Sequence, residues 1–325
     1  MSANVPFLSV ESLSVHFASP KRFFGGAPRP IRAVDGVSFT LERGRTLGLV
    51  GESGCGKSTT GYAMLQLVRP TAGRVTLDGV ELTALSAKAM RPWRRRMQII
   101  FQDSAASLDP RMPVGDLVAE ALDIHHLHRG EGREKRIREL LDLVGIAPHF
   151  AERYPHELSG GQAQRIAICR ALAVEPDLIV CDEPVSALDV SIQAQIVNLL
   201  QNLQREFGLT YVFISHDLSV VRHVSDEVAV MYLGRIVERA PKMRIFESAA
   251  HPYSRALLSA VPIPDPDIER ARERVVLTGD IPSPADPPSG CRFRTRCPQA
   301  VEVCATTEPP AKTLVPGHEA YCLFA

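Results

Sequence analysis

Residues 51–59, which read GESGCGKST, restrict the possible folds of this chain more than any other segment. They follow the apolar run 47–50, which predicts a strand, and they precede a stretch with the pattern of an amphipathic helix. Glycines in such a loop let successive backbone N–H groups turn toward phosphate oxygens, and the helix N-terminus adds the positive end of its dipole. The spacing therefore predicts a phosphate-binding loop between a strand and a helix.

The side chains of this loop are expected to bind a nucleotide and its metal ion. Lys57 would reach the β- and γ-phosphates, and the Ser58 hydroxyl would ligate Mg²⁺. A glycine-rich turn without a ligand is the alternative, which the flanking strand and helix disfavour. The expected nucleotide-binding residues of the loop are Gly51, Ser53, Gly54, Cys55, Gly56, Lys57, Ser58 and Thr59.

A second apolar strand, in residues 177–184, ends in the two acids Asp182 and Glu183. At the carboxyl end of a parallel strand these side chains would face the phosphate loop. Asp182 would hold Mg²⁺, directly or through water, and Glu183 would polarise the attacking water. An Asp-Glu pair alone is more often a solvated turn, but the phosphate loop favours a site.

The remaining pattern predicts an α/β fold. Residues 7–76 indicate strands broken by turns, Asp78-Gly79 a hairpin, and 18–33 a surface loop. Residues 111–157 indicate mostly helix, and 177–182 and 209–215 indicate buried parallel strands. Between those strands lies a helix whose apolar stripe would comprise Ile192, Ile196, Leu199, Leu203 and Phe207.

Composition narrows the class of protein further. The 37 basic and 37 acidic side chains cancel, which argues against a general nucleic-acid or anionic-membrane binder. No apolar run approaches the roughly 18 to 20 residues that cross a bilayer, and the N-terminus lacks a signal-peptide pattern. We therefore expect a cytoplasmic, reducing compartment, in which the 7 cysteines are buried thiols or metal ligands rather than disulfides.

Residues 158–162 read LSGGQ and stand before the strand that ends in Asp182. Together with GESGCGKST and LIVCDE, they resemble the nucleotide-binding subunit of ATP-binding cassette (ABC) transporters. The resemblance implies a P-loop NTPase (RecA-like) core with an antiparallel β subdomain, a helical signature subdomain at about 103–165, and a small Pro/Cys-rich C-terminal extension. The implied boundaries are 1–245 for the cassette domain and 246–325 for the extension.

The LSGGQ segment also has a local interpretation. Ser159 and two glycines at the start of a helix from Gln162 to about Ala173 predict another helix N-terminus that can receive an anion. In the family, this segment grips the γ-phosphate of ATP held by the opposite subunit, so that hydrolysis requires a partner. The residues that would make this contact are Ser159, Gly160, Gly161 and Gln162.

The resemblance implies further site residues. Gln102 would contact Mg²⁺ and the attacking water, Asp189 would link the two half-sites, and His216 would contact the γ-phosphate. Phe17 would stack on adenine, with an ordinary strand core residue as the alternative. The implied catalytic residues are Glu183, His216 and Gln102, and the implied Mg²⁺ ligands are Ser58, Gln102 and Asp182.

Several segments, including SHDLSVV and HPYSRALLSAVP (251–262), look like the ATPases of the dipeptide, oligopeptide and nickel importer family. This implies an ATP-hydrolysing subunit that powers import, with peptides as the favoured solute and nickel or another small solute as alternatives. A soluble cassette ATPase acting on nucleic acid or ribosomes, and a metal-sensing regulator, are alternatives from other classes.

The same resemblance implies partners and a location. These are a second cassette ATPase, favoured as a paralogue in a heterodimer, two transmembrane permease subunits and an extracytoplasmic substrate-binding protein, with no nucleic acid. The chain would bind peripherally at the cytoplasmic face of the inner membrane.

Four thiols in the extension can close a tetrahedral zinc site or hold an iron–sulfur cluster: Cys291, Cys297, Cys304 and Cys322. From the residues alone zinc is the default, whereas a similar C-x5-C-x6-C motif in some peptide importers favours a [4Fe-4S] cluster. Free thiols or an adventitious disulfide remain the third possibility. Arg292, Arg294 and Arg296 would offset the charge of the thiolates, and a structural clamp is the expected role.

Overall fold

The computed structural model describes residues 6–18, 29–262, 265, 267, 270 and 275–325, so most of the expected surface loop at 18–33 lies outside the described residues. The chain divides into two compact units. The first comprises residues 1–41, 47–83 and 216–325, and the second comprises 42–46 and 84–215. Each unit is described by itself.

The first unit contains a four-stranded antiparallel sheet in the order β2-β1-β4-β5. Its strands are β1 (Leu8–Phe17), β2 (Ile31–Leu41), β4 (Ala72–Leu77) and β5 (Val80–Glu81). The hairpin between β4 and β5 turns at Asp78 and Gly79, which have φ angles of 50° and 78°, as a tight turn between twisted strands requires. The expected hairpin is confirmed.

A second set of strands in this unit carries the phosphate loop. Strand β3 (Thr46–Val50) pairs in parallel with β9 (Glu227–Tyr232), and β9 pairs antiparallel with β10 (Arg235–Pro241). The C-terminal strands β12 (His318–Ala320) and β11 (Lys312–Val315) extend the sheet from β10. Residues 312–315 and 318–320 therefore belong to the same sheet as the strand that leads into the phosphate loop.

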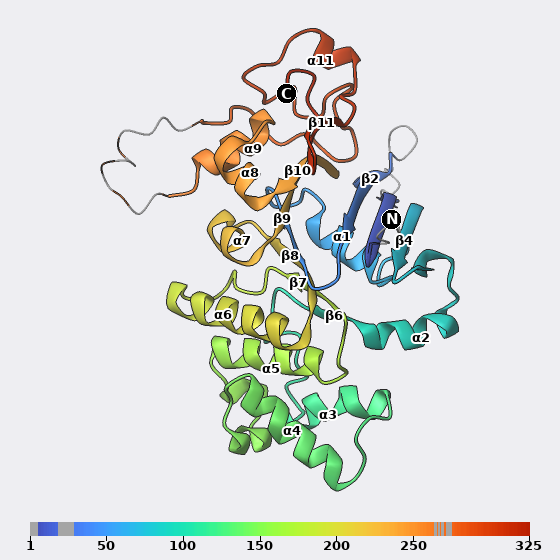
Figure 1. The fold of residues 1–325 in the computed structure, drawn as a ribbon, viewed down its shortest axis with the longest axis vertical. Coiled ribbons are helices and arrows are strands. Elements are labelled where there is room, and N and C mark those ends of the chain that lie inside the picture. The colour runs from blue at the N-terminus through green and yellow to red at the C-terminus, as the bar shows by residue number, and fades with distance from the viewer. Residues whose placement is uncertain (1–5, 19–28, 263–264, 266, 268–269, 271–274) are drawn as a thin grey trace, which may run out of the picture. The chain divides into compact units, whose positions relative to one another are not determined.

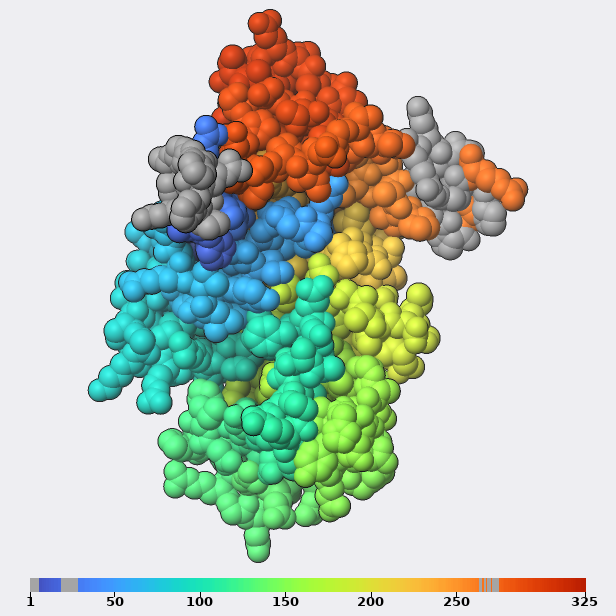
Figure 2. Space-filling model, turned by 180° about the vertical axis from the view of Figure 1, so that it is seen from behind, coloured from blue at the N-terminus to red at the C-terminus, as the bar shows by residue number. Residues whose placement is uncertain are grey.

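Helices of the first unit cover these strands. They are α1 (Lys57–Met64), α7 (Leu218–Val224), α8 (Lys242–Ser248), α9 (Pro252–Ser259) and α11 (Val303–Thr306). Helix α1 contacts β1 and β2, and α8 contacts β9 and β10, as Figure 1 shows. Residues 275–325, in orange to red, gather into one mass of atoms in Figure 2.

The second unit has a parallel sheet of β6 (Met97–Ile100), β7 (Leu178–Asp182) and β8 (Thr210–Ser215). All residues of β7 and β8 are buried, which confirms the two expected parallel strands. The helices are α2 (Ala87–Arg96), α3 (Val114–Ile124), α4 (Glu131–Leu143), α5 (Gly160–Leu172) and α6 (Val190–Phe207), with short 3-10 turns η2 (Pro148–Glu152) and η3 (Pro155–Glu157). A further 3-10 turn, η1 (Leu82–Ala84), begins in the first unit and ends in the second. The mixed α/β fold expected from the sequence is thus confirmed.

The apolar stripe expected on α6 is only partly correct. The residues that α6 buries are Ile196, Val197, Leu200 and Leu203, so Val197 and Leu200 replace Ile192 and Leu199. Phe207 is 50% exposed because it belongs to the last turn, before the chain leaves the helix at Gly208. No helix in the described part of the chain is long and apolar enough to cross a bilayer.

Candidate functional site

The phosphate loop of the first unit owes its shape to two glycines. Gly56, the N-cap of α1, has a φ of 103°, and a Cβ atom there would lie 2.1 Å from the carbonyl oxygen of Ala33. A Cβ at Gly51 would lie 2.2 Å from the carbonyl oxygen of Met231. Such distances exclude any side chain. At these two glycines the loop backbone therefore packs directly against the backbone of β9 and of the start of β2.

Lys57 lies across this loop and is only 4% exposed. Its ammonium group donates hydrogen bonds to the carbonyl oxygens of Gly51, at 2.8 Å, and Glu52, at 3.0 Å. The Cys55 thiol is buried beside it, and burial raises the pKa of this thiol although the Lys57 charge opposes the shift. Cys55 therefore stays protonated and packs as a small apolar group.

The other expected loop residues have different surroundings. Ser53 and Gly54 are exposed at the tip of the loop, whereas Ser58 and Thr59 are half-buried in the first turn of α1. Helix α1 thus begins at the loop, and the positive end of the helix dipole favours an anion bound there.

In the second unit, Gln102 and Glu183 meet. Gln102 follows β6 and Glu183 follows β7, and the side chain of Gln102 donates a hydrogen bond from Nε2 to Glu183 Oε2 at 3.0 Å. The two strands are parallel neighbours, so their carboxyl ends lie at the same edge. Asp182 ends β7 and is 1% exposed. These three expected residues are therefore brought together.

Glu183 has an uncommon backbone conformation. Its φ is 46°, in the left-handed region that few residues other than glycine adopt. Its N–H donates to the carbonyl oxygen of Ile214 at 3.0 Å, which fixes this conformation against β8. Strained backbone conformations of this kind occur more often at functional sites, where contacts with the surrounding structure stabilise them.

The LSGGQ segment begins α5 at Gly160, two residues earlier than expected from the sequence. Ser159 is the N-cap, and its hydroxyl accepts a hydrogen bond from the Gln162 N–H at 3.3 Å. In return, Gln162 Oε1 accepts from the Ser159 N–H at 2.9 Å, which completes a capping box. Both side chains thus hold the helix N-terminus in place.

A cavity in the second unit includes residues that the sequence did not single out. Ser104 and Gln164 line it together with Gln102 and Gly160, and they are hydrogen-bonded to one another. Gln164 is 3% exposed, and its Nε2 has no hydrogen-bond partner among the described residues. Nothing in the local pattern around Gln164 distinguishes it from an ordinary helix residue, because its role depends on a loop 60 positions away.

The remaining expected residues are exposed. Asp189 occupies the N-cap position of α6, and His216 directly follows β8. Phe17 ends β1 with 42% of its side chain exposed, so it is not a core residue of that strand.

The four cysteines of the extension converge on one pocket, together with His251 and Phe293. All seven cysteines of the chain are free thiols. Burial raises the pKa of Cys291 and Cys297. Among the residues that the structure describes, however, no group of three or more His, Cys, Asp or Glu side chains is arranged to hold a metal ion. The described arrangement is therefore a cluster of four thiols that line one pocket.

Two of the three arginines between these cysteines pair with carboxylates, whereas the third, Arg294, lines the cysteine pocket. Arg292 pairs with Asp35 and Arg296 pairs with Glu52, while Arg294 donates to the carbonyl oxygen of Ser289 at 3.0 Å. The charges of Arg292 and Arg296 are thus compensated by carboxylates rather than by thiolates.

Comparisons with known proteins agree with this geometry. The sequence model described as ABC transporter matches residues 34–186, and the one described as oligopeptide/dipeptide transporter, C-terminal region, matches residues 237–304. The putative oligopeptide transport ATP-binding protein YkfD of Bacillus subtilis (strain 168) is 50% identical over 319 residues, which cover 98% of this chain and 95% of that protein. The oligopeptide transport ATP-binding protein OppF of Salmonella typhimurium (strain LT2) is 53% identical over 306 residues, covering 93% of this chain and 91% of OppF.

Solved structures are similar as well. The dimeric post-hydrolysis state of the ATP-binding cassette MJ0796 bound to ADP and Pi aligns with a TM-score of 0.65 at 28% identity, covering 72% of this chain and 98% of that chain. CbiO1 of Clostridium perfringens, part of the ABC transporter complex cbiONQ, aligns with a TM-score of 0.64 at 28% identity, covering 75% and 91%. The fold is that of an ATP-binding cassette.

The chain belongs to the ATP-binding subunits of the oligopeptide/dipeptide group of ABC transporters. It binds ATP with Mg²⁺ and couples ATP hydrolysis to transport.

Proposed function

We propose that this subunit powers the import of dipeptides or oligopeptides. The observation that carries the choice of solute class is the match of residues 237–304 to the C-terminal region of oligopeptide/dipeptide transporters, together with relatives named for peptide transport over nearly the whole chain. The partners are two permease subunits and an extracytoplasmic binding protein, and the chain binds peripherally at the cytoplasmic face of the inner membrane.

The chain's own residues divide the chemistry between them. The backbone of the phosphate loop and Lys57 bind the phosphates, and the hydroxyl of Ser58, the carboxylate of Asp182 and the amide of Gln102 hold Mg²⁺. Magnesium, when bound, neutralises charge on the phosphate oxygens. Glu183 accepts the proton of the attacking water, and its hydrogen bond with Gln102 orients the carboxylate.

The other proposed contacts complete the nucleotide site. His216 contacts the γ-phosphate, and Phe17 stacks its exposed ring on adenine. Asp189 connects the two half-sites across the dimer.

Hydrolysis requires a second cassette in this proposal. The segment from Ser159 to Gln162 starts α5 with a fixed N-terminus, which suits the γ-phosphate of ATP bound to another subunit. We favour a paralogous partner and hence a heterodimer. Mass measurement of the purified transporter tests this point, because two copies of this chain per complex would contradict it.

The cysteine pocket is proposed to hold a [4Fe-4S] cluster, with zinc as the alternative. The convergence of the four thiols on one pocket supports the proposal. Among the described residues, no group of three or more His, Cys, Asp or Glu side chains is arranged to hold a metal ion, and this finding does not support the proposal. We therefore assign no step of the mechanism to a metal in this pocket. Iron, sulfide and zinc analysis of protein purified without oxygen distinguishes a cluster, zinc and free thiols.

The main experiment uses the complex of this chain with its co-purifying subunits in proteoliposomes. We expect ATP-dependent uptake of a peptide that the binding protein delivers, and loss of ATP turnover with retained ATP binding in Glu183→Gln. Uptake of nickel but no peptide would contradict the solute class. Undiminished turnover of the Glu183→Gln complex would contradict the role given to that carboxylate.

A further inference from the structure

Two residues in the C-terminal part of the chain, Tyr253 and Arg296, contact Glu52 of the phosphate loop. The Arg296 guanidinium donates two hydrogen bonds to the Glu52 carboxylate, from Nη1 to Oε2 at 2.6 Å and from Nη2 to Oε1 at 2.9 Å. The N–H of Glu52 donates to the hydroxyl of Tyr253 at 3.0 Å. The carbonyl oxygen of Glu52 accepts from Lys57 at 3.0 Å. Side chain, N–H and carbonyl of Glu52 therefore each have a partner.

The contact between Arg296 and Glu52 is shielded from water. The Arg296 side chain is 7% exposed and that of Glu52 is 25% exposed. Two parallel hydrogen bonds between a guanidinium and a carboxylate fix direction as well as distance. These hydrogen bonds raise the pKa of Arg296 above its usual value, so its charge is permanent.

Tyr253, like Arg296, is fixed by contacts with buried neighbours. It is 0% exposed, and its ring centroid lies 4.7 Å from that of Tyr232 and 5.3 Å from that of Phe293. Its N–H donates to Nδ1 of His251 at 3.1 Å, which fixes the start of α9. The hydroxyl that meets Glu52 thus comes from a rigid aromatic cluster.

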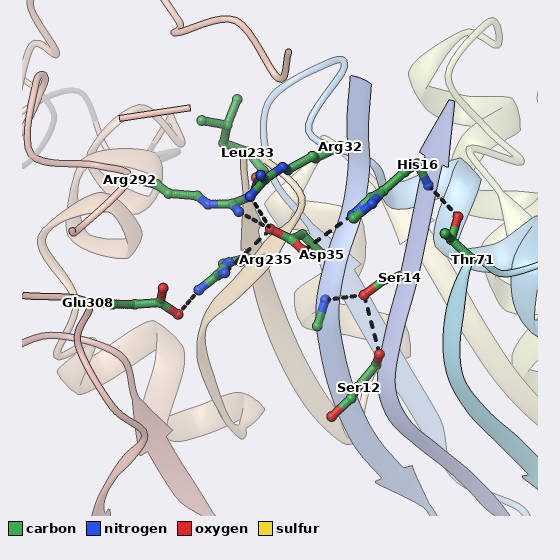
Figure 3. A network of polar contacts seen from close by, with 11 residues as sticks. Ser12, Ser14, His16, Arg32, Asp35, Thr71, Leu233, Arg235, Arg292 and Glu308 are labelled. Carbon is green, nitrogen blue, oxygen red and sulfur yellow. Dashed lines mark hydrogen bonds and ion pairs between the residues drawn. The ribbon is translucent and has the colours of Figure 1, made fainter. Parts of the chain in front are cut away.

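The segment that carries Arg296 has its own anchor, drawn in Figure 3. Arg292 pairs with Asp35 of β2 and donates to the carbonyl oxygen of Leu233 at 2.6 Å. Arg235 adds a contact to the same Asp35 oxygen at 3.4 Å. Arg296, four residues after Arg292, is therefore presented from a fixed loop rather than from a free tail.

We propose that Arg296 and Tyr253 are positioning residues for nucleotide binding. Both contact Glu52, and through Glu52 they hold in place the loop backbone that Lys57 contacts and that binds the phosphates. The inference rests on the proposed role of the phosphate loop and extends it to the C-terminal extension of the same chain. Neither residue needs to touch the nucleotide. They hold Glu52, the second residue of the loop, so that the loop already has its binding conformation before ATP binds. ATP binding then costs less conformational entropy.

The test measures ATP affinity of the full chain by calorimetry for Arg296→Met, Glu52→Gln and the double variant. We expect each single variant to weaken ATP binding about tenfold, and the double variant to be no weaker than either, because the residues act as one pair. Tyr253→Phe removes the hydroxyl alone and should weaken binding about threefold, given that a neutral hydrogen bond contributes about 1 kcal/mol or less. Arg294→Met is the matched control and should bind ATP as the unmodified chain does.

Steady-state kinetics of the assembled transporter separate positioning from general stability. We expect the KM for ATP to rise about tenfold in Arg296→Met while kcat changes less than twofold, whereas a merely destabilised chain would lose active sites at unchanged KM. Arg296→Lys keeps the charge but not the fork, and should recover part of the loss.

The outcomes are distinct. If the unmodified chain binds ATP and Glu52→Gln, Arg296→Met and Tyr253→Phe bind it equally well, the positioning role is wrong and the proposed function stands. If Arg296→Met does not fold, the ATP affinities of Glu52→Gln and Tyr253→Phe still test the positioning role. If the unmodified chain binds no ATP, both the proposed function and this inference are wrong.

Discussion

The Nε2 atom of His318 lies 2.8 Å from Oε1 of Glu238, a residue that is 0% exposed. The same carboxylate accepts hydrogen bonds from the N–H groups of Ala250, at 2.7 Å, and His251, at 2.9 Å. One buried side chain on β10 therefore holds both β12 and the start of α9. The segments that lead to the cysteine pocket and to Tyr253 depend on this carboxylate.

Replacing Glu238 by Ala should lower the free energy of unfolding by roughly 3 kcal/mol, because three donors, two of them buried, lose their acceptor. Urea unfolding followed by fluorescence measures the change. Glu319→Ala, a half-buried carboxylate on β12, is the control and should shift stability by no more than about 0.5 kcal/mol. Equal effects of the two variants would contradict the role of Glu238.

Gly56→Ala should destabilise the chain far more than Gly54→Ala. Both glycines have positive φ angles, of 103° and 76°, which cost about 1 to 2 kcal/mol for an L-residue. Only at Gly56 would the new Cβ meet a carbonyl oxygen, that of Ala33 at 2.1 Å, whereas no described atom lies within 4 Å of a Cβ at Gly54. Thermal unfolding should therefore show a cost for Gly56→Ala about 2 kcal/mol larger than for Gly54→Ala. Similar costs would mean that the loop yields to the added methyl group.

Gln102→Ala should slow ATP turnover of the assembled transporter roughly 10- to 100-fold, because a hydrogen bond to a charged group contributes about 1.5 to 3 kcal/mol. Gln98→Ala is a matched control, since Gln98 donates to the carbonyl oxygen of Arg94 at 2.7 Å and not to Glu183. If both variants lose activity equally, the contact between Gln102 and Glu183 is not what orients the carboxylate.

Acid should weaken the anchor between β2 and the cysteine segment. Burial raises the pKa of Asp35, but Arg292 and Arg235 outweigh it, so the pKa is lowered from the ordinary value of 3.8. The stabilisation by Asp35 is therefore complete above about pH 4 to 5 and is lost as pH falls through its lower pKa in the folded chain. Unfolding of the unmodified chain and of Asp35→Asn should differ at pH 6 and converge toward pH 2. A constant difference over that range would contradict the charge pairing.

The sequence predicted those parts of the site that depend on local order along the chain. A strand, a glycine loop and a helix in succession identify the phosphate loop, and the two acids at the end of β7, Asp182 and Glu183, follow from a similar local pattern. Neighbouring parallel strands then bring Gln102 and Glu183 to one edge. The helix that starts near Ser159 was also predicted, although it begins at Gly160 rather than at Gln162.

Contacts between distant segments could not be predicted in this way. Arg296 meets Glu52 across 244 positions, and the Tyr253 hydroxyl meets the same residue across 201. The alternation of arginines and cysteines suggested charge compensation of thiolates, but partner choice depends on which carboxylates the fold brings near. The exposure of Phe207 likewise reflects where α6 ends rather than its periodicity.

The first unit is assembled from segments at the start, middle and end of the chain. Its phosphate loop leaves the ribosome long before Tyr253 and Arg296 exist, since Arg296 follows Glu52 by 244 residues. At about 5 to 20 residues per second, that interval lasts roughly 10 to 50 seconds. During this time Glu52 has neither of these partners, and the newly made loop depends on the strands and helices already present. Glu52 thus gains its two distant contacts only after this interval.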